Sequence, residues 1–440
     1  MPSSNSSTPF RPLKIVAYGS LTVLIAMMMA GTVIEKLHGP EAAAHAIYHH
    51  PVFFALWAVT AVAGLVWLLQ RLGTRRPFTL LLHAALVLIL AGALVTHLSG
   101  LSGSVHLREG VPTDTLELED GSSVELPFLM ELKEFRIEYD PGTTHVADYV
   151  SELIFLPRGD SGSAAGMTKN TAAGMTGNFS SFAGLTGESP VTISMNHIAK
   201  RDGYRFYQAD YDEDGRGSIL AVSRDPWGVG ITYAAYLLLL LAMVGYFFEK
   251  DSYRQELLGT LRRGQAPTRG RKRWTLALSA AGAAILVVWF LGAFPKGPLL
   301  PVLRSPLLFL HMIPIMVSYA LFALTTILGI VGVLLPAEKS ARLMSVSWLI
   351  LLPAVFLLAF GTFLGGVWAN ISWGNYWAWD PKETWALVTL LVYSFALHGT
   401  ATGFLRTPKA FHAFCIVAFL CVLVTYFGVN LLLGGMHSYA

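Results

Sequence analysis

The sequence predicts an all-α polytopic membrane protein with about nine transmembrane helices and one extracytoplasmic β-rich domain. Of its 440 residues, 54% are hydrophobic and only 13% are charged, whereas soluble proteins carry about 25% charged residues. The 31 basic and 28 acidic residues nearly balance, and the basic residues fall between apolar runs. This distribution indicates a membrane topology and argues against a nucleic-acid-binding protein.

Nine apolar stretches are long enough to cross a bilayer, since a helix needs about 20 residues to span about 30 Å of hydrocarbon. The first stretch lacks a small-residue cleavage site, so we interpret it as a retained helix. The nine stretches lie near residues 13–34, 51–70, 78–100, 227–248, 274–293, 308–335, 345–366, 384–405 and 411–434.

The basic residues predict the orientation of these helices. Seventeen Lys and Arg residues fall on one side of the predicted bundle, and four fall in the short loops of the other side. Because cytoplasmic loops are enriched in basic residues, the N-terminus is predicted to be cytoplasmic and the C-terminus extracytoplasmic. The protein is then a multi-pass protein of the cell (inner) membrane, and residues 101–225 lie outside.

Residues 101–225 are predicted to form the β-rich domain. This segment contains 20 acidic and 10 basic residues, and LELEDGSSVEL alternates on both sides of an Asp120–Gly121 turn. Alternation around Asp-Gly is typical of a β-hairpin, and LKEFRIEY and RFYQADY are further strand-like runs. Residues 158–188 are rich in Gly, Ser, Ala and Thr and contain AAGMT twice, which predicts a flexible surface loop.

Five of the 11 tryptophans fall within 18 residues, in WANISWGNYWAWDPKETW. An interfacial aromatic belt would explain them, but belt tryptophans are scattered over many helix ends. A dense aromatic cluster suits a flat, apolar ligand, and Lys382 could meet an anionic substituent of it. The five are Trp368, Trp373, Trp377, Trp379 and Trp385, interspersed with Asp380, Lys382 and Glu383.

Two pairs of histidines are candidate metal ligands. His311 lies at the outer end of the sixth predicted helix, and His437 follows the ninth. This outer pair shares the depth of the tryptophans and could hold one metal centre axially; two unrelated interfacial histidines are the alternative. His83 lies seven residues beyond Arg76, and His398 lies eight residues before Arg406.

The inner pair is predicted to lie about 10 to 12 Å from the inner face, at a rise of 1.5 Å per residue. Ionisable residues inside membrane segments face a bundle interior or a cofactor, and neutral imidazole is the usual protein ligand of haem iron. The alternative is a pair that only packs helices. Four more histidines, His38, His45, His49 and His50, are interpreted as a solvated loop, and Cys415 and Cys421 as packing residues.

Several motifs resemble a known family. WGNYWAWDPKETW, with WAN before it and VYSFALHG after it, resembles the WWD signature of cytochrome c biogenesis and haem-handling proteins. LHMIPIMVSYALF and FGVNLLLGGMHSYA resemble the CcsA branch, whereas GSVHLREG, DYVSEL and GYRFYQADYDEDGRGSILAVSRDPWG resemble ResB/CcsB. The chain thus resembles a fused ResB/CcsA-type System II cytochrome c synthase. It divides into a ResB-like region 1–250, a basic cytoplasmic linker 251–273 and a CcsA-like region 274–440 with a WWD loop 367–385.

The resemblance implies a function and a set of ligands. His83 and His398 would bind the iron of an internal haem b, and His311 and His437 that of an external haem. Trp368, Trp373, Trp377, Trp379 and Asp380 would complete the external site. A synthase (haem lyase) of this kind supplies no nucleophile, because the thiols of a CxxCH apocytochrome c add to the haem vinyl groups. It contributes positioning, and thiol-reducing proteins and membrane lipid are its further expected partners.

Two other functions use the same residues. A membrane electron carrier would hold two bis-His haems b, but such carriers usually draw both pairs from the same two helices, whereas these four histidines lie on or beside four different predicted helices. A haem exporter without ligase activity shares every residue and differs only in its acceptor.

Overall fold

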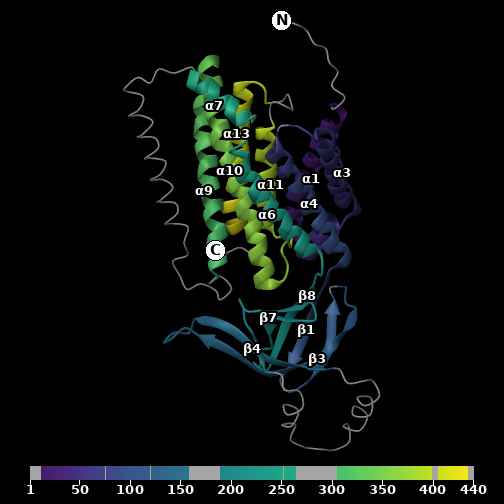
Figure 1. Cartoon of the computed structure of the whole chain (residues 1–440). Coiled ribbons are helices and arrows are strands. Elements are labelled where there is room, and N and C mark those ends of the chain that lie inside the picture. Colours follow the sequence, from purple (N-terminus) through teal and green to yellow (C-terminus); the bar gives the residue numbers. More distant parts are fainter. Residues whose placement is uncertain are drawn as a thin grey trace, which may run out of the picture.

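The computed structural model describes residues 11–74, 76–118, 120–157, 189–250, 252–263, 305–398 and 405–434. A bundle of long helices stands on a separate β domain (Figure 1), so the predicted fold class is confirmed. The predicted helix 274–293 and the predicted loop 158–188 lie outside the described residues.

The first part of the chain forms helices that come before and after the β domain in the sequence. Several begin at a proline, whose fixed φ suits the first helical position. They are α1 (Arg11–His38), α2 (Pro40–Ala43), η1 (Ala44–Tyr48), α3 (Pro51–Arg71), α4 (Pro77–Ser99), α6 (Gly228–Tyr246) and α7 (Tyr253–Arg263).

The second part of the chain forms the other half of the bundle. Its elements are α9 (Pro306–Leu334), α10 (Ala337–Trp373), α11 (Pro381–Leu397), α13 (Pro408–Leu423) and the π-helix η4 (Val424–Leu433). The last helix therefore ends as a π-helix, a rare form that is frequent at functional sites.

Within the described residues, seven helices are long and apolar enough to cross a membrane. The chain is accordingly a multi-pass membrane protein. Large apolar side chains such as Leu69, Leu98 and Leu334 are more than half exposed on the helix surfaces, as expected where lipid is the solvent. Two lengths differ from the prediction: α11 ends at Leu397, not 405, and α10 runs to Trp373, beyond the predicted end at 366.

The β domain is one eight-stranded antiparallel sheet in the order β5-β4-β3-β2-β1-β8-β7-β6. The predicted hairpin around Gly121 joins β2 to β3, and the φ of Gly121 is +80°, which only glycine adopts without strain. The strands are β1 (Leu101–Arg108), β2 (Thr113–Leu118), β3 (Ser123–Tyr139), β4 (Val146–Pro157), β5 (Val191–Ile193), β6 (Ala199–Arg201), β7 (Tyr204–Tyr211) and β8 (Gly217–Arg224).

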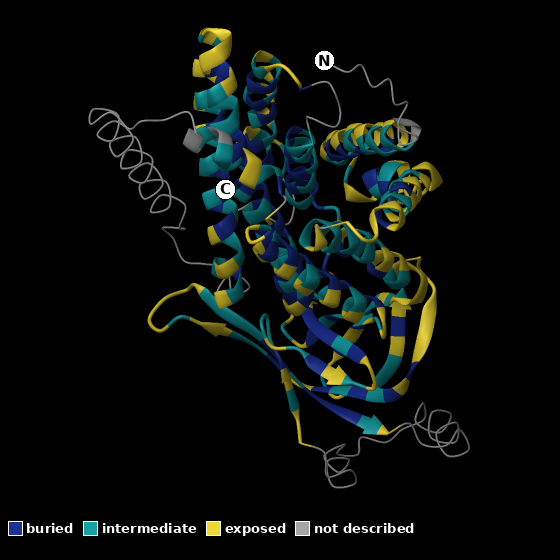
Figure 2. Cartoon of the chain, turned by 45° about the horizontal axis from the view of Figure 1, so that its top comes forward, coloured by how far each residue is buried: buried dark blue, intermediate teal, exposed yellow. Residues whose placement is uncertain are grey.

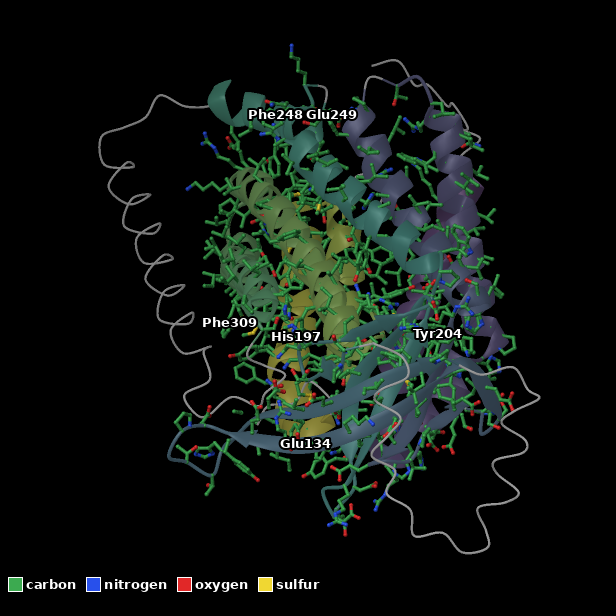
Figure 3. The ribbon with its side chains drawn as sticks, turned by 60° about the horizontal axis from the view of Figure 1, so that its bottom comes forward. Glu134, His197, Tyr204, Phe248, Glu249 and Phe309 are labelled. Carbon is green, nitrogen blue, oxygen red and sulfur yellow. The ribbon has the colours of Figure 1, made fainter. Side chains whose placement is uncertain are left out.

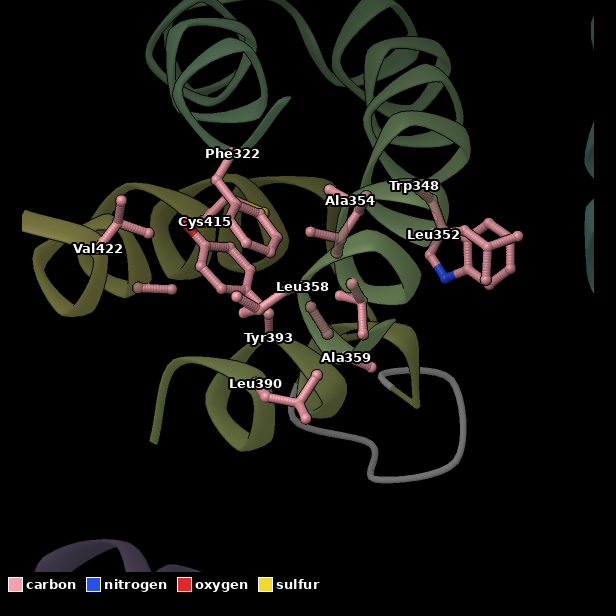
Figure 4. Packing of buried hydrophobic residues seen from close by; sticks show 14 of the residues in the cluster. Phe322, Trp348, Leu352, Ala354, Leu358, Ala359, Leu390, Tyr393, Cys415 and Val422 are labelled. Carbon is pink, nitrogen blue, oxygen red and sulfur yellow. The ribbon is translucent and has the colours of Figure 1, made fainter. Parts of the chain in front are cut away.

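Each part of the molecule has its own apolar core (Figure 2). In the β domain, alternate strand residues such as Val105, Leu116 and Phe206 are fully buried. In the bundle, the rings of Phe322 on α9 and Tyr393 on α11 stack with centroids 3.9 Å apart (Figure 4). In lipid such contacts stabilise a bundle by van der Waals packing, and this cluster joins α9, α10, α11 and α13.

Candidate functional site

The structure brings the inner histidines, His83 and His398, together although 315 positions separate them in sequence. His83 lies in the second turn of α4, and His398 is the C-cap residue of α11. Their ring centroids are 6.0 Å apart and the ring planes are nearly perpendicular, at 87°. We call this pair the inner site; it lies in the half of the bundle away from the β domain.

Each ring makes a hydrogen bond of the same kind, to a carbonyl oxygen four residues earlier in its own helix. Nδ1 of His83 lies 2.8 Å from the carbonyl oxygen of Thr79, and Nδ1 of His398 lies 2.8 Å from that of Ser394. A carbonyl oxygen only accepts, so Nδ1 must carry the proton in each ring. Nε2 then keeps its lone pair, as metal-binding imidazoles require.

The spacing of the two rings fits a shared metal ion. An imidazole nitrogen binds such an ion at about 2 Å, so two imidazoles on opposite sides of it have ring centroids about 6 Å apart. The observed centroid separation of 6.0 Å is close to this value. The pair could therefore hold haem iron axially.

Aromatic side chains from two further helices border the inner site. The ring of Trp67 on α3 lies 4.6 Å from that of His83. On the other side, Tyr18 on α1 lies 6.3 Å from His398 and 5.5 Å from Phe395. Flat apolar faces of this kind suit a porphyrin, so four helices contribute to the inner site.

The outer histidine His311 lies in the second turn of α9, beside the end of α10. Its ring stacks on Trp368 with centroids 5.5 Å apart and an interplanar angle of 17°. Trp373 meets Trp368 edge-on at 4.7 Å. Gly365 permits this approach, because a Cβ there would lie 3.2 Å from the His311 ring. The second expected outer ligand, His437, lies outside the described residues.

The remaining tryptophans belong to a second group. Trp379 stacks on Tyr48 with ring centroids 5.0 Å apart, and Phe53 meets it edge-on at 5.1 Å. Trp377 lies 5.7 Å from Trp379. Trp368 and Trp379 belong to different buried clusters, so the tryptophans are divided between two groups, each anchored on another element of the bundle.

The loop between α10 and α11 is shorter than the sequence suggested. Residues 367–373 are the end of α10, so only 374–380 form the loop. Trp379 has a φ of +58°, a conformation that is strained for a bulky residue and is typical of functional loops. Asp380 ends the loop as the N-cap of α11, accepting a hydrogen bond of 2.9 Å from the Lys382 amide.

Charged residues of the motif are held within the protein. The ammonium of Lys382 donates to Oδ1 of Asn430 in η4 at 2.8 Å. Oε2 of Glu383 accepts from the Ala378 amide at 2.9 Å. Glu383 thus ties the loop to α11, and Lys382 ties the start of α11 to η4.

The β domain also contacts the end of α10. The hydroxyl of Tyr207 on β7 donates to the carbonyl of Asn370 at 3.1 Å, and a guanidinium nitrogen of Arg205 lies 3.2 Å from Asn370 Oδ1. The Asn370 amide donates to the Tyr233 hydroxyl at 2.6 Å. One signal for this contact is present in the sequence: Asn370 is a polar residue next to an apolar run. The prediction assigned it no role.

The first outer segment agrees with the prediction in part. His38, His45, His49 and His50 are all exposed, as expected of solvated histidines. The segment is not a loop, however: it forms α2 and η1, and Tyr48 is 3% exposed against Trp379. His50 caps α3 by accepting from the Val52 amide. The contact of this segment with the tryptophan-rich loop comes from Tyr48 and not from its histidines.

Two family models match the chain in succession. The ResB-like family matches residues 70–229, and the cytochrome C assembly protein family matches residues 237–437. This chain joins a ResB-like region to a cytochrome c assembly region. His83 lies in the ResB-like region and His398 in the cytochrome c assembly region, so the inner site forms only where the two regions meet.

Similar proteins carry related names. Protein NrfI of Wolinella succinogenes is 40% identical over 152 residues, which are 32% of this chain and 17% of that protein. The cytochrome c biogenesis protein CcsA of Chlamydomonas reinhardtii is 39% identical over 153 residues, 32% of this chain and 43% of that protein. CcsA of Mesostigma viride is 34% identical over 177 residues, which are 32% of this chain and 57% of that protein. The chain therefore spans less than two thirds of each of these relatives.

Two tryptophans of the motif should differ in their effects. Trp385 is 8% exposed and its indole donates to Thr32 of α1 at 3.1 Å, so Trp385→Ala should lower stability by about 3–5 kcal/mol. Trp377 is half-buried at the loop, so Trp377→Ala should weaken ligand binding there more than it lowers stability. Thermal unfolding in detergent and haem titration separate the two effects. A larger stability loss from Trp377→Ala would contradict this assignment.

Proposed function

We propose that this protein acts in cytochrome c biogenesis, carrying haem across the membrane and attaching it to the CxxCH motif of an apocytochrome c. The observation that carries the proposal is the inner site. Two imidazoles with ring centroids 6.0 Å apart, each with Nδ1 on a carbonyl oxygen, suit haem iron. The family matches at both regions support the same function.

Haem b is the substrate in this proposal. It is received at the inner site, between His83 and His398, and passes to an outer site beside the β domain. At the outer site His311 and His437 are the proposed iron ligands, with Trp368, Trp373, Trp377 and Trp379 against the porphyrin and Asp380 fixing the loop. The division of the tryptophans into two groups is compatible with a ligand that lies between them.

The attachment needs no nucleophile from this protein. Each cysteine thiol of the CxxCH motif adds across one haem vinyl group, so that a carbon–sulfur bond forms and the thiol hydrogen ends on the other vinyl carbon. The atoms balance without a leaving group. The protein contributes by orienting haem and peptide, which replaces a bimolecular encounter with a positioned one. Thiol-reducing partners keep the cysteines of the apocytochrome reduced.

The proposed orientation follows from the basic residues. With the N-terminus of α1 on the cytoplasmic side of the cell (inner) membrane, the inner site lies near the cytoplasmic face. The β domain and the outer site then face the compartment in which cytochromes c are assembled. The ResB-like region 1–250 supplies the β domain, a linker 251–273 follows, and region 274–440 supplies the outer site.

A reconstitution in cells tests the function. The full chain is co-expressed with a CxxCH reporter in a host that lacks its own cytochrome c maturation, and covalent haem is detected on the reporter after denaturing electrophoresis. A reporter with both cysteines changed to serine is the control. Covalent haem on the first reporter alone supports a synthase. Haem released without attachment would instead support an exporter, and tightly bound redox-active haem without attachment would support an electron carrier.

A further inference from the structure

The antiparallel pair α4 and α6 carries an acidic side chain at each end. Close approach of the two helices is made possible by glycines: a Cβ on Gly92 would lie 2.4 Å from the Thr232 hydroxyl, and one on Gly245 would overlap the Phe78 ring. Gly92 and Gly245 thus let the two helices pack closely, and we call the pair α4 and α6 the strut.

Glu249 lies at the end of the strut away from the β domain (Figure 3). It follows α6 and is only 4% exposed. Its Oε1 accepts from the backbone amides of Phe78 and Thr79, at 3.1 and 3.2 Å, and its Oε2 accepts from the Thr79 hydroxyl at 2.5 Å. A carboxylate at a helix N-terminus satisfies amides that have no partner within the helix and is favoured by the helix dipole.

The first turn of α4 links Glu249 to the inner site. The carbonyl oxygen of Thr79 accepts the proton of His83 Nδ1 at 2.8 Å. Glu249 thus holds Thr79, the residue that orients the His83 ring, through two hydrogen bonds, and its neighbour Phe78 through a third. Outer partners of metal-binding histidines are known to set ring orientation and basicity.

Asp225 has the corresponding place at the opposite end of the strut. Its Oδ1 accepts from the Gly228 amide at 2.7 Å, and its Oδ2 accepts from the Val229 amide at 3.0 Å and from the Thr96 hydroxyl at 2.6 Å. Asp225 therefore caps α6 and ties it to the last turn of α4.

The Thr96 hydroxyl continues the link to the tryptophan-rich loop. It accepts a hydrogen bond from the Tyr376 hydroxyl at 2.8 Å. Tyr376 stands between Trp373 and Trp377 in sequence and is 8% exposed. The chain of contacts runs from Asp225 through Thr96 and Tyr376 into residues 374–380.

We propose that Glu249 and Asp225 are positioning residues, one for each haem site of the proposed function. Glu249 orients His83 at the inner site through Thr79. Asp225 fixes the tryptophan-rich loop of the outer site through Thr96 and Tyr376. The helix pair α4 and α6 thereby supports both sites from its two ends. This inference rests on the proposed function, because it assigns roles at the sites where haem is to bind.

The test titrates purified full-length protein with ferric haem in two backgrounds. In His311→Ala only the inner site is read, and in His83→Ala only the outer site. Glu249→Ala should weaken haem binding at the inner site up to about tenfold, the lower limit for direct outer partners of a ligand, because Glu249 acts through Thr79; it should also raise the high-spin fraction of the ferric spectrum. Binding at the outer site should be unchanged. Glu249→Gln keeps one acceptor oxygen for the two amides and should restore much of the inner affinity.

Tyr376→Phe gives the converse experiment. It removes one hydroxyl from a buried ring and should weaken the outer site, because the tryptophan-rich loop loses its hydrogen bond to Thr96, while the inner site is unaffected. Asp225→Ala should act in the same direction. Glu256→Gln, at an exposed glutamate of α7, is the control and should change neither site.

The pattern of effects decides between positioning and mere stabilisation. If Glu249→Ala and Tyr376→Phe weaken both sites alike, or if either leaves its own site unchanged, the assignment is overturned. If neither parent background binds haem, the proposed function fails, and this inference fails with it. The proposal is supported if Glu249→Ala weakens only the inner site and Tyr376→Phe weakens only the outer site.

Discussion

Replacing His83 or His398 with alanine should empty the inner site and abolish cytochrome c synthesis. Each imidazole supplies one axial position, and the rings lie 6.0 Å apart on separate helices, so a single remaining histidine cannot hold the iron from both sides. Purified His83→Ala should therefore lose its inner-site haem, and any haem that stays at this site should be high-spin. Absorption spectra and haem content per protein measure the effect.

A matched control comes from another buried histidine. His412 on α13 is 0% exposed, and its Nε2 lies 3.1 Å from the Ser340 carbonyl oxygen. His412→Gln should leave the haem spectrum unchanged. Exogenous imidazole should enter the space left in His83→Ala and restore part of the low-spin signal. Unchanged haem content in both the His83 and His398 variants would mean that this pair only packs helices.

Replacing His311 with alanine should remove haem from the outer site, abolish attachment to the reporter and leave the inner haem in place. The two sites are separable because His311 is near the β-domain end of α9, whereas His83 and His398 lie in the opposite half of the bundle. His437→Ala is expected to behave in the same way, on the basis of the family resemblance. The measurement is the haem spectrum together with covalent haem on the reporter.

The control for this experiment is His49→Ala, at an exposed position of the first outer loop. It should have no effect on either haem. The two-site arrangement is refuted if His311→Ala empties both sites equally, or if the reporter still acquires covalent haem without His311.

Much of the architecture followed from composition and periodicity. Long apolar runs can only be helices in lipid, since every backbone amide needs a partner there, and the alternation around Gly121 requires a hairpin. Helix ends were predicted less well. Trp373 still belongs to α10, and α11 ends at Leu397, because hydropathy registers apolar character and not the residue at which hydrogen bonding stops.

The candidate residues were recognisable for a local reason. A histidine within an apolar run, such as His83 or His311, is costly in a membrane and therefore conspicuous. The dense tryptophans near Asp380 were conspicuous in the same way. Tyr48 and Asn370 were not, because an aromatic or an amide near a helix end has many ordinary explanations.

The sequence by itself determined the membrane class, the β domain and the residue types capable of holding iron. Only the tertiary structure decided which of them meet. His83 and His398 meet because the N-terminal end of α4 and the C-terminal end of α11 lie at one depth. Trp379 lies on Tyr48 because α1 packs against α11. Such pairings depend on interactions between residues hundreds of positions apart, for which periodicity within one segment carries no information.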